Sequence, residues 1–227
     1  MSVDFSVVSI GTVSSNAFWN EPPGVRTPHA TTTLVRDGDR LILVDPSLPA
    51  SGLVNRLFER TGLKSEAITD IFCTTLRPTH RRAIEAFPKA AWLAPEAELA
   101  AYRSHLESLA DSSRRLEGEA QAAVRADLAL MQRFAPAPEK LTPQVHLFPL
   151  PGPSVGSAGL LLAGARLTVM VAGDAALTAD HVLAMRVWEG CADIEAAMAS
   201  LTEIVEIADL IVCGHDNYML GPTRWSA

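Results

Sequence analysis

The chain has 227 residues, of which 48 % are apolar and 20 % charged, and its formal net charge is −7. That length suits one large domain or two small ones, and the composition is that of a globular rather than a disordered chain. An acidic chain repels phosphate backbones and anionic membranes unless its basic residues gather locally. Here they form only isolated pairs such as Arg81-Arg82. We therefore expect neither nucleic acid nor a membrane as a partner.

The chain carries three cysteines, an odd number with no CxxC spacing, so we expect reduced thiols rather than a disulfide framework. It contains no run of about 18 apolar residues that would span a membrane. It also does not open with a basic segment followed by an apolar stretch, as a secretory signal would. On these grounds the sequence predicts a cytoplasmic protein.

The N-terminal part of the chain predicts strands with one clear helix among them. Asp37-Gly38 between two apolar runs is typical of a β-hairpin. Apolar residues at helical spacing predict a helix over 51–61, which Gly62 ends. A shorter helix-like segment covers 81–87. Strands are predicted at 3–10, 31–35, 41–45, 70–74 and 91–94.

A long stretch rich in Ala, Leu, Glu and Arg occupies residues 95–134. Its apolar residues recur at helical spacing, which predicts two helices broken near 111–113. This stretch could cover the entrance of a site or a dimer face, or it could be an ordinary amphipathic surface layer. The proline-bearing residues 136–143 that follow predict a linker-like stretch, too short to demand a domain boundary.

The C-terminal part of the chain again alternates strands with helices. Strands separated by helices in both halves of a chain favour a layered α/β fold with the helices outside. The strands are predicted at 145–150, 159–163, 166–173 and 209–213, and the helices around 178–186 and 191–207.

Three polar side chains each lie just past the end of a predicted strand: His80, Asp174 and His215. Ligands and catalytic groups collect at strand ends because rigid strands fix the loop residues there. Two imidazoles and one carboxylate at one rim would suit a divalent metal. A lone Asp after a strand is also an ordinary cap or turn residue. Spacing alone therefore leaves both interpretations open.

Five segments appear in a characteristic order: ILVDPS (42–47), ITDIFCTTLRPTHRRAIEAFPKA (68–90), LPGPSVGSAGLLL (150–162), VMVAGDA (169–175) and LIVCGHDN (210–217). In order and spacing the chain resembles the metallo-β-lactamase superfamily. Its members show a strand ending in Asp, then T-H-x-H-x-D-H, P-G-H-T-x-G-S, G-D and a late G-H. The resemblance implies an α/β fold of the αββα sandwich type, with two mixed β-sheets and helices on the outer faces. It implies one domain over 1–227, with a helical insertion at about 95–134.

The resemblance implies a first metal held by three histidines, and all three are replaced. Thr75, Arg77 and Pro153 occupy their positions. The guanidinium of Arg77 stays protonated, so it would repel a metal and pair with Asp174. It could act catalytically by steadying an oxyanion or a substrate carboxylate or phosphate. It could instead form a structural salt bridge in a vacated cavity. Arg77 and Asp174 are the candidate catalytic residues.

The resemblance also implies a second metal site, which is only partly retained. Thr79 replaces the family's aspartate, while His80, Asp174 and His215 remain. A hydroxyl cannot take a proton at neutral pH, and losing a general base lowers a rate by roughly 10²–10⁴. We therefore do not expect the usual two-metal route. The three residues could hold one divalent metal, Zn²⁺ or Fe²⁺, with open positions for water and substrate. Alternatively, they remain as polar packing and hold no metal.

Other residues are weaker candidates for the site. Asp45 matches a position that supports the site structurally. His29 and His181 could reach the rim, but we expect both to be exposed to solvent. Asp216 could orient the ring of His215 or merely make the turn. Loop aromatics could line a pocket or partner surface, although core or rim packing is the plainer interpretation; they are Phe18, Trp19, Trp188, Tyr218 and Trp225.

Two functions follow from these residues. The first is a diverged hydrolase that uses one metal, or Arg77 in place of the second, on a small ester, lactone, thioester or phosphoester. The second is a non-catalytic relative, a pseudoenzyme that retains the fold to bind a ligand or partner. A nuclease is disfavoured by the acidic charge and the missing ligands. A small molecule is the expected ligand, and homo-oligomerisation stays open.

Overall fold

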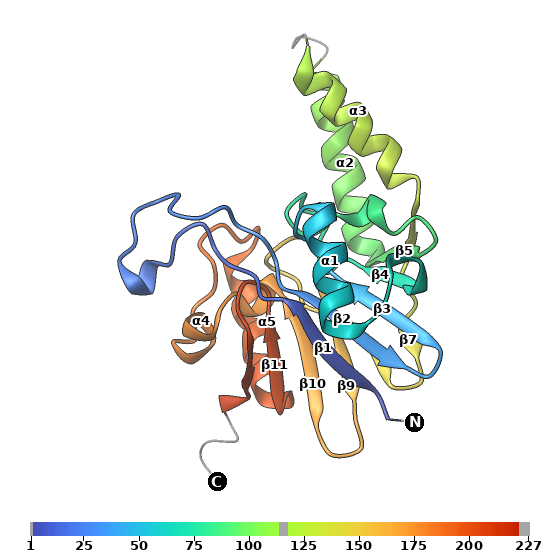
Figure 1. The fold of residues 1–227 in the computed structure, drawn as a ribbon. Coiled ribbons are helices and arrows are strands. Elements are labelled where there is room, and N and C mark those ends of the chain that lie inside the picture. The colour runs from blue at the N-terminus through green and yellow to red at the C-terminus, as the bar shows by residue number, and fades with distance from the viewer. Residues whose placement is uncertain (1, 114–117, 223–227) are drawn as a thin grey trace.

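The computed structural model describes residues 2–113 and 118–222, and two six-stranded sheets form its centre (Figure 1). The first sheet has the order β1-β2-β3-β4-β5-β6, antiparallel from β1 to β3 and parallel from β3 to β6. Its strands are β1 (Asp4–Ser9), β2 (Thr32–Asp37), β3 (Arg40–Val44), β4 (Asp70–Phe72), β5 (Ala91–Ala94) and β6 (Phe134–Pro136).

The second sheet has the order β12-β11-β10-β9-β8-β7 and is also mixed, because only β10 and β11 run parallel. Its strands are β7 (Lys140–Thr142), β8 (Val145–Pro149), β9 (Ala158–Ala163), β10 (Thr168–Gly173), β11 (Leu210–Cys213) and β12 (Tyr218–Leu220).

The apolar side chains form three buried clusters, and these clusters define the layers. Side chains alternate between the faces of a strand, so Leu43 of β3 packs outward while Ile42 and Val44 pack toward the second sheet. The middle cluster fills the space between the sheets. The outer two lie under the helices. The chain is an αββα sandwich, as the sequence predicted.

Five helices accompany the sheets in the described residues: α1 (Ala50–Thr61), α2 (Glu96–Ser113), α3 (Glu119–Met131), α4 (Ala179–Leu183) and α5 (Ile194–Ile207). Leu53 and Leu57 anchor α1 in the outer cluster of the first sheet, and Gly62 ends the helix with a φ of 71°. Leu201 and Ile204 anchor α5 against the second sheet. In Figure 1, α2 and α3 pack side by side and project from the body of the molecule. No helix of the described residues is long and apolar enough to cross a membrane.

Several predicted elements differ from the observed ones. Residues 81–87 form only a short 3-10 turn, Ile84–Ala86, because Ala83 donates its N–H to the carbonyl of Pro46 instead of continuing a helix. The segment 136–143 is not a plain linker, since it includes the end of β6 and all of β7. The two helices predicted over 95–134 are present as α2 and α3, but α2 continues through 111–113, where the break between them was predicted. The edge strand β12 was not predicted, because it is three residues long and half-exposed.

Candidate metal centre

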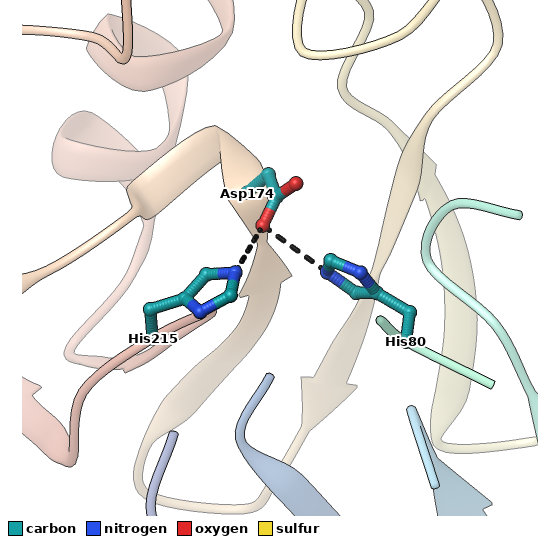
Figure 2. Close-up of side chains that lie close together, drawn as sticks. All are labelled: His80, Asp174 and His215. Carbon is teal, nitrogen blue, oxygen red and sulfur yellow. Dashed lines mark hydrogen bonds and ion pairs between the residues drawn. The ribbon is translucent and has the colours of Figure 1, made fainter. Parts of the chain in front are cut away.

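His80, Asp174 and His215 meet at one rim, and Figure 2 shows both imidazoles pointing at the carboxylate. Each Nε2 atom lies 3.1 Å from the same oxygen, Oδ1 of Asp174. One ligand-type atom from each residue lies within 4.8 Å of the others. His80 is fully buried, and the side chain of Asp174 is 3 % exposed. The three residues that the sequence placed at strand ends therefore form one cluster.

The parallel pair β10 and β11 brings Asp174 and His215 together, and two glycines let the strands end so closely. Gly173 has a φ of 56°, and a Cβ there would lie 2.5 Å from Oγ1 of Thr74. A Cβ on Gly214 would lie 2.5 Å from the carbonyl oxygen of Gly173. A side chain on Gly214 would push the ends of β10 and β11 apart, and one on Gly173 would push the end of β10 away from Thr74, so either would displace a ligand residue.

His80 reaches the rim from the first sheet, on the loop that follows β4. Its N–H donates to the carbonyl of Arg77 at 2.9 Å, and the hydroxyl of Ser47 donates to the carbonyl of Thr79. These bonds hold the loop in a tight turn over the first sheet. The site therefore joins the edges of both sheets.

The hydrogen bonds of the two imidazoles assign them different protonation states. Nδ1 of His215 faces the carbonyl of Thr12 at 3.0 Å and its Nε2 faces Asp174, so both nitrogens point at acceptors. A ring in that setting carries a proton on each nitrogen unless a metal replaces the one on Nε2. Nδ1 of His80 instead lies 3.4 Å from the Thr79 hydroxyl, which can donate to it. His80 is thus a neutral ring with its proton on Nε2.

The pKa directions agree with this assignment. Burial lowers the pKa of His80 to about 4, more than the charge of Asp174 raises it. Burial also lowers the pKa of His215, but the hydrogen bond and charge of Asp174 outweigh it and the pKa ends above 6.5. Burial would raise the pKa of Asp174, yet the imidazoles and Arg77 hold it well below its usual range. The carboxylate is therefore ionised and available as a ligand.

Arg77 stands where the resemblance placed a ligand of the first metal, and it pairs with Asp174 as predicted. Its Nη1 donates to Oδ2 of Asp174 at 2.6 Å, and its Nη2 donates to the carbonyl of Pro153. The guanidinium also stacks on the ring of Trp188, 4.5 Å from the ring centre. A protonated guanidinium fills this position, so these residues do not fit a first metal.

Glu98, at the start of α2, is a buried residue of the rim that sequence reasoning missed. Its carboxylate accepts hydrogen bonds from the hydroxyls of Thr75 and Ser154, both at 2.7 Å. It also accepts from the backbone N–H groups of Leu76 and Gly156. Glu98 thereby links the loop of Thr75 and Leu76, which leads into Arg77, to the loop of Ser154 and Gly156. Nothing in its local pattern distinguishes it from Glu96, which also lies in the first turn of α2.

Asp45 supports the site from below, as the resemblance implied. It accepts hydrogen bonds from the N–H and hydroxyl of Thr74 at 2.9 and 2.7 Å. Burial raises the pKa of Asp45 to about 8, although the bonds from Thr74 work in the opposite direction. Because Thr74 packs against Gly173, Asp45 fixes the floor on which Asp174 sits.

A cavity of about 360 Å³ opens above the cluster, and Arg77, Asp174 and His215 form part of its wall. His181 lines it too, so the expectation that this residue is simply exposed was wrong; its ring packs edge-on against Phe18 at 5.0 Å. Trp188 also lines the cavity.

The remaining candidates among the described residues lie outside the cavity wall. His29 is half-buried and its Nε2 lies 3.1 Å from the carbonyl of Ile10. Asp216 makes the turn, with its carboxylate accepting from Ala179. Trp19 and Tyr218 are mostly exposed, and Trp225 lies outside the described residues.

The donor set of the cluster fits one divalent metal. Two imidazole nitrogens and one ionised carboxylate oxygen suit Zn²⁺ or Fe²⁺. Nε2 of His215 faces an anion with a replaceable proton, which is what a metal ligand requires. His80, Asp174 and His215 would hold this single ion. Thr75, Arg77 and Pro153, at the position of the first metal, are engaged in other hydrogen bonds and offer no ligand to a second ion.

No family model matches the sequence, and no curated protein is similar to it. Solved structures do match. A metallo-beta-lactamase-like protein from Thermotoga maritima aligns with a TM-score of 0.70 and 16 % identity, over 97 % of this chain and 100 % of its own. An N-acyl homoserine lactone hydrolase, solved with N-hexanoyl-L-homoserine at its catalytic metal centre, gives 0.64 and 19 % over 95 % and 94 %. The hydrolase AbOPH gives 0.65 and 15 % over 97 % and 91 %. This chain therefore has the metallo-β-lactamase fold.

Proposed function

We propose that this chain is a diverged hydrolase that works with a single divalent metal on a small ester, lactone, thioester or phosphoester. The observation that carries the proposal is the convergence of His80, Asp174 and His215 beside a cavity of about 360 Å³. A cavity of that size suits a small molecule.

Each residue of the rim has a distinct role in this proposal. His80, Asp174 and His215 hold the metal, which supplies Lewis acidity toward a carbonyl or phosphoryl oxygen. The Nη1 bond of Arg77 to Oδ2 of Asp174 orients the carboxylate so that Oδ1 faces both imidazoles. The guanidinium, fixed by its two bonds, steadies negative charge that develops on the substrate. Thr79, beside the cavity, offers a hydroxyl that binds and orients but takes no proton at neutral pH.

Among the matching proteins is a lactone hydrolase with its product bound at a catalytic metal centre. Identities of 15–19 % carry the fold and not the substrate. Lactones therefore join esters, thioesters and phosphoesters as the compounds to assay.

The second candidate is a non-catalytic ligand-binding protein, and the Arg77–Asp174 bond favours it. At 2.6 Å this ion pair already neutralises the carboxylate, and both imidazoles also point at it. The cluster is thus satisfied by its own hydrogen bonds. If these outcompete a metal, the fold serves binding alone.

Metal content and hydrolysis, measured on the same preparations, separate the two candidates. We expect about one equivalent of zinc or iron per chain by mass spectrometry after exposure to metal and gel filtration, together with hydrolysis of at least one compound from a panel of small esters, lactones, thioesters and phosphoesters. His80→Gln and His215→Gln should each lower the metal content below one-tenth and abolish turnover. His105→Gln on the exposed face of α2 is the matched control and should retain both.

Circular dichroism of each variant separates loss of the ion from loss of the fold. Metal-free wild-type protein, unchanged by chelator and inactive on the whole panel, would contradict the hydrolase and favour the binding protein. Two equivalents of metal would contradict the single site. One equivalent that persists in both His→Gln variants would place the ion elsewhere.

A further inference from the structure

The guanidinium of Arg77 is only partly used by the protein. Its described hydrogen bonds run from Nη1 to Asp174 and from Nη2 to Pro153. A guanidinium carries five N–H donors, and this side chain lines the cavity with 27 % of its surface exposed. Arg77 therefore retains donors for a ligand.

The carboxylate of Asp174 does not repel an anion in this cavity. Its Oδ2 is paired with Arg77, and its Oδ1 is shared by His80 and His215 at 3.1 Å each. Its side chain is 3 % exposed. The negative charge is thus covered on both oxygens and balanced by the neighbouring cation.

A second arginine stands in the wall of the same cavity. Arg186 stacks on the ring of Phe18 at 5.3 Å, much as Arg77 stacks on Trp188 at 4.5 Å. Both rings line the cavity and orient the cations beside them. Glu189 also lies in this wall, but its side chain is 90 % exposed and 3.8 Å from Arg186. Two arginines in one cavity stand out in a chain whose acidic residues outnumber its basic ones by 26 to 19.

We propose that the cavity binds a small molecule in which an oxyanion group, a carboxylate or a phosphate, is joined to an apolar body. Arg77 binds the oxyanion through charge-assisted hydrogen bonds, and Phe18 and Trp188 enclose the body. This inference rests on the proposed function for its assignment of the cavity as the substrate site. It narrows the substrate to an anionic ester, thioester or phosphoester, or to a lactone that carries an acidic group.

Calorimetric titration with three phenyl compounds tests the proposal. Phenyl phosphate and phenylacetate present the two oxyanions, and benzyl alcohol is the neutral comparison. We expect both anions to bind at least about 10-fold more tightly than the alcohol, and the tighter of the two identifies the oxyanion. Arg77→Met should weaken anion binding by roughly 10- to 100-fold, the range that a hydrogen bond to a charged group supplies, and should leave the alcohol unchanged. Arg77→Lys keeps the positive charge but loses the paired N–H donors of the guanidinium. Its affinity for the anions should therefore lie between those of the wild type and Arg77→Met.

Arg133 provides the matched control, because it also stacks on a tryptophan, Trp92, at 3.6 Å but does not line the cavity. Arg133→Met should bind all three compounds like the wild type. Equal affinity of the wild type for anions and alcohol overturns the proposal, and so does unchanged anion binding in Arg77→Met. If that variant does not fold, Arg186→Met takes its place and should weaken the anions selectively.

The titration is run on chelator-treated and on metal-loaded protein, so that this proposal and the proposed function fail separately. Anion preference without metal or turnover upholds the ligand class and rejects the hydrolase. Metal binding and turnover of neutral compounds, without a preference for anions, upholds the hydrolase and rejects the ligand class.

Discussion

Asp174 is the residue that all the other charged or ligand-type side chains of the cluster contact. Nε2 of His80, from the first sheet, and Nε2 of His215, from the second, both face its Oδ1. Nη1 of Arg77 donates to its Oδ2. Removing this carboxylate would leave the partly buried guanidinium of Arg77 without its charge partner and the two imidazoles without their common acceptor, which is a costly arrangement.

Asp45 makes stability depend on pH in a direction that can be worked out. Its pKa is about 8 in the folded protein against an ordinary 3.8. The folded state therefore binds a proton that the unfolded state has released, and the contribution of Asp45 is complete below pH 3.8 and lost as pH rises to about 8. We expect the free energy of unfolding of the wild type, relative to Asp45→Asn, to fall between pH 4 and 8 and then to level.

Denaturant titrations of wild type and Asp45→Asn at several pH values measure this difference. Asn is the appropriate substitution because its side-chain oxygen can accept from the Thr74 N–H and because it tolerates the φ of 48° at this position. Asp45→Ala should lose about 1–3 kcal/mol through the unsatisfied N–H of Thr74, and about 1–2 kcal/mol more because Ala tolerates the left-handed backbone less well. A pH-independent gap between wild type and Asp45→Asn would show that the carboxyl is ionised in the folded protein.

At the level of elements, the backbone at the end of β10 determines where Asp174 lies. Gly173 and Gly38 have nearly equal φ values, 56° and 58°. A Cβ on Gly38, in the β2–β3 hairpin, meets nothing within 4 Å, whereas one on Gly173 meets Thr74. Gly38→Ala should therefore lose only the left-handed backbone term, about 1–2 kcal/mol. Gly173→Ala should lose more, because the ψ of −145° at Gly173 lies outside the left-handed helical region and because the Cβ adds a steric clash with Thr74.

Chemical denaturation of the two glycine variants tests this contrast, and metal content provides a second readout. Only Gly173→Ala should also lower metal binding, since it displaces Asp174 relative to His215. Equal losses of stability, with metal content unchanged in both, would mean that the close approach of β10 to Thr74 is not needed by the site.

The elements differ in how well their sequences predict them. The β2–β3 hairpin and α1 were predicted to within a residue or two, because Asp37-Gly38 and Gly62 are strong local signals. The 81–87 turn was not, because Ala83 donates its N–H to Pro46, far away in the sequence. The strand β12 was not predicted either, although its partner β11 is close in the sequence, because β12 is three residues long and half-exposed. Local pattern is informative where a segment is long enough to show it and bonds locally.

For the whole molecule, the sequence could predict that some residues of the site meet and could not predict others. The convergence of His80, Asp174 and His215 followed from strand ends and from the family resemblance. The contribution of Glu98 and the place of His181 in the cavity wall did not, because they depend on how α2 and α4 pack. The single-domain organisation remains a prediction.

The central claim is that three side chains from two sheets hold one ion, with Arg77 standing where a second would lie. Anomalous diffraction at the zinc edge, from crystals equilibrated with zinc, tests it most directly. The account predicts one peak per chain, bonded to His80, Asp174 and His215, with the guanidinium of Arg77 still paired to Asp174. Two peaks, or none at this cluster, would contradict it.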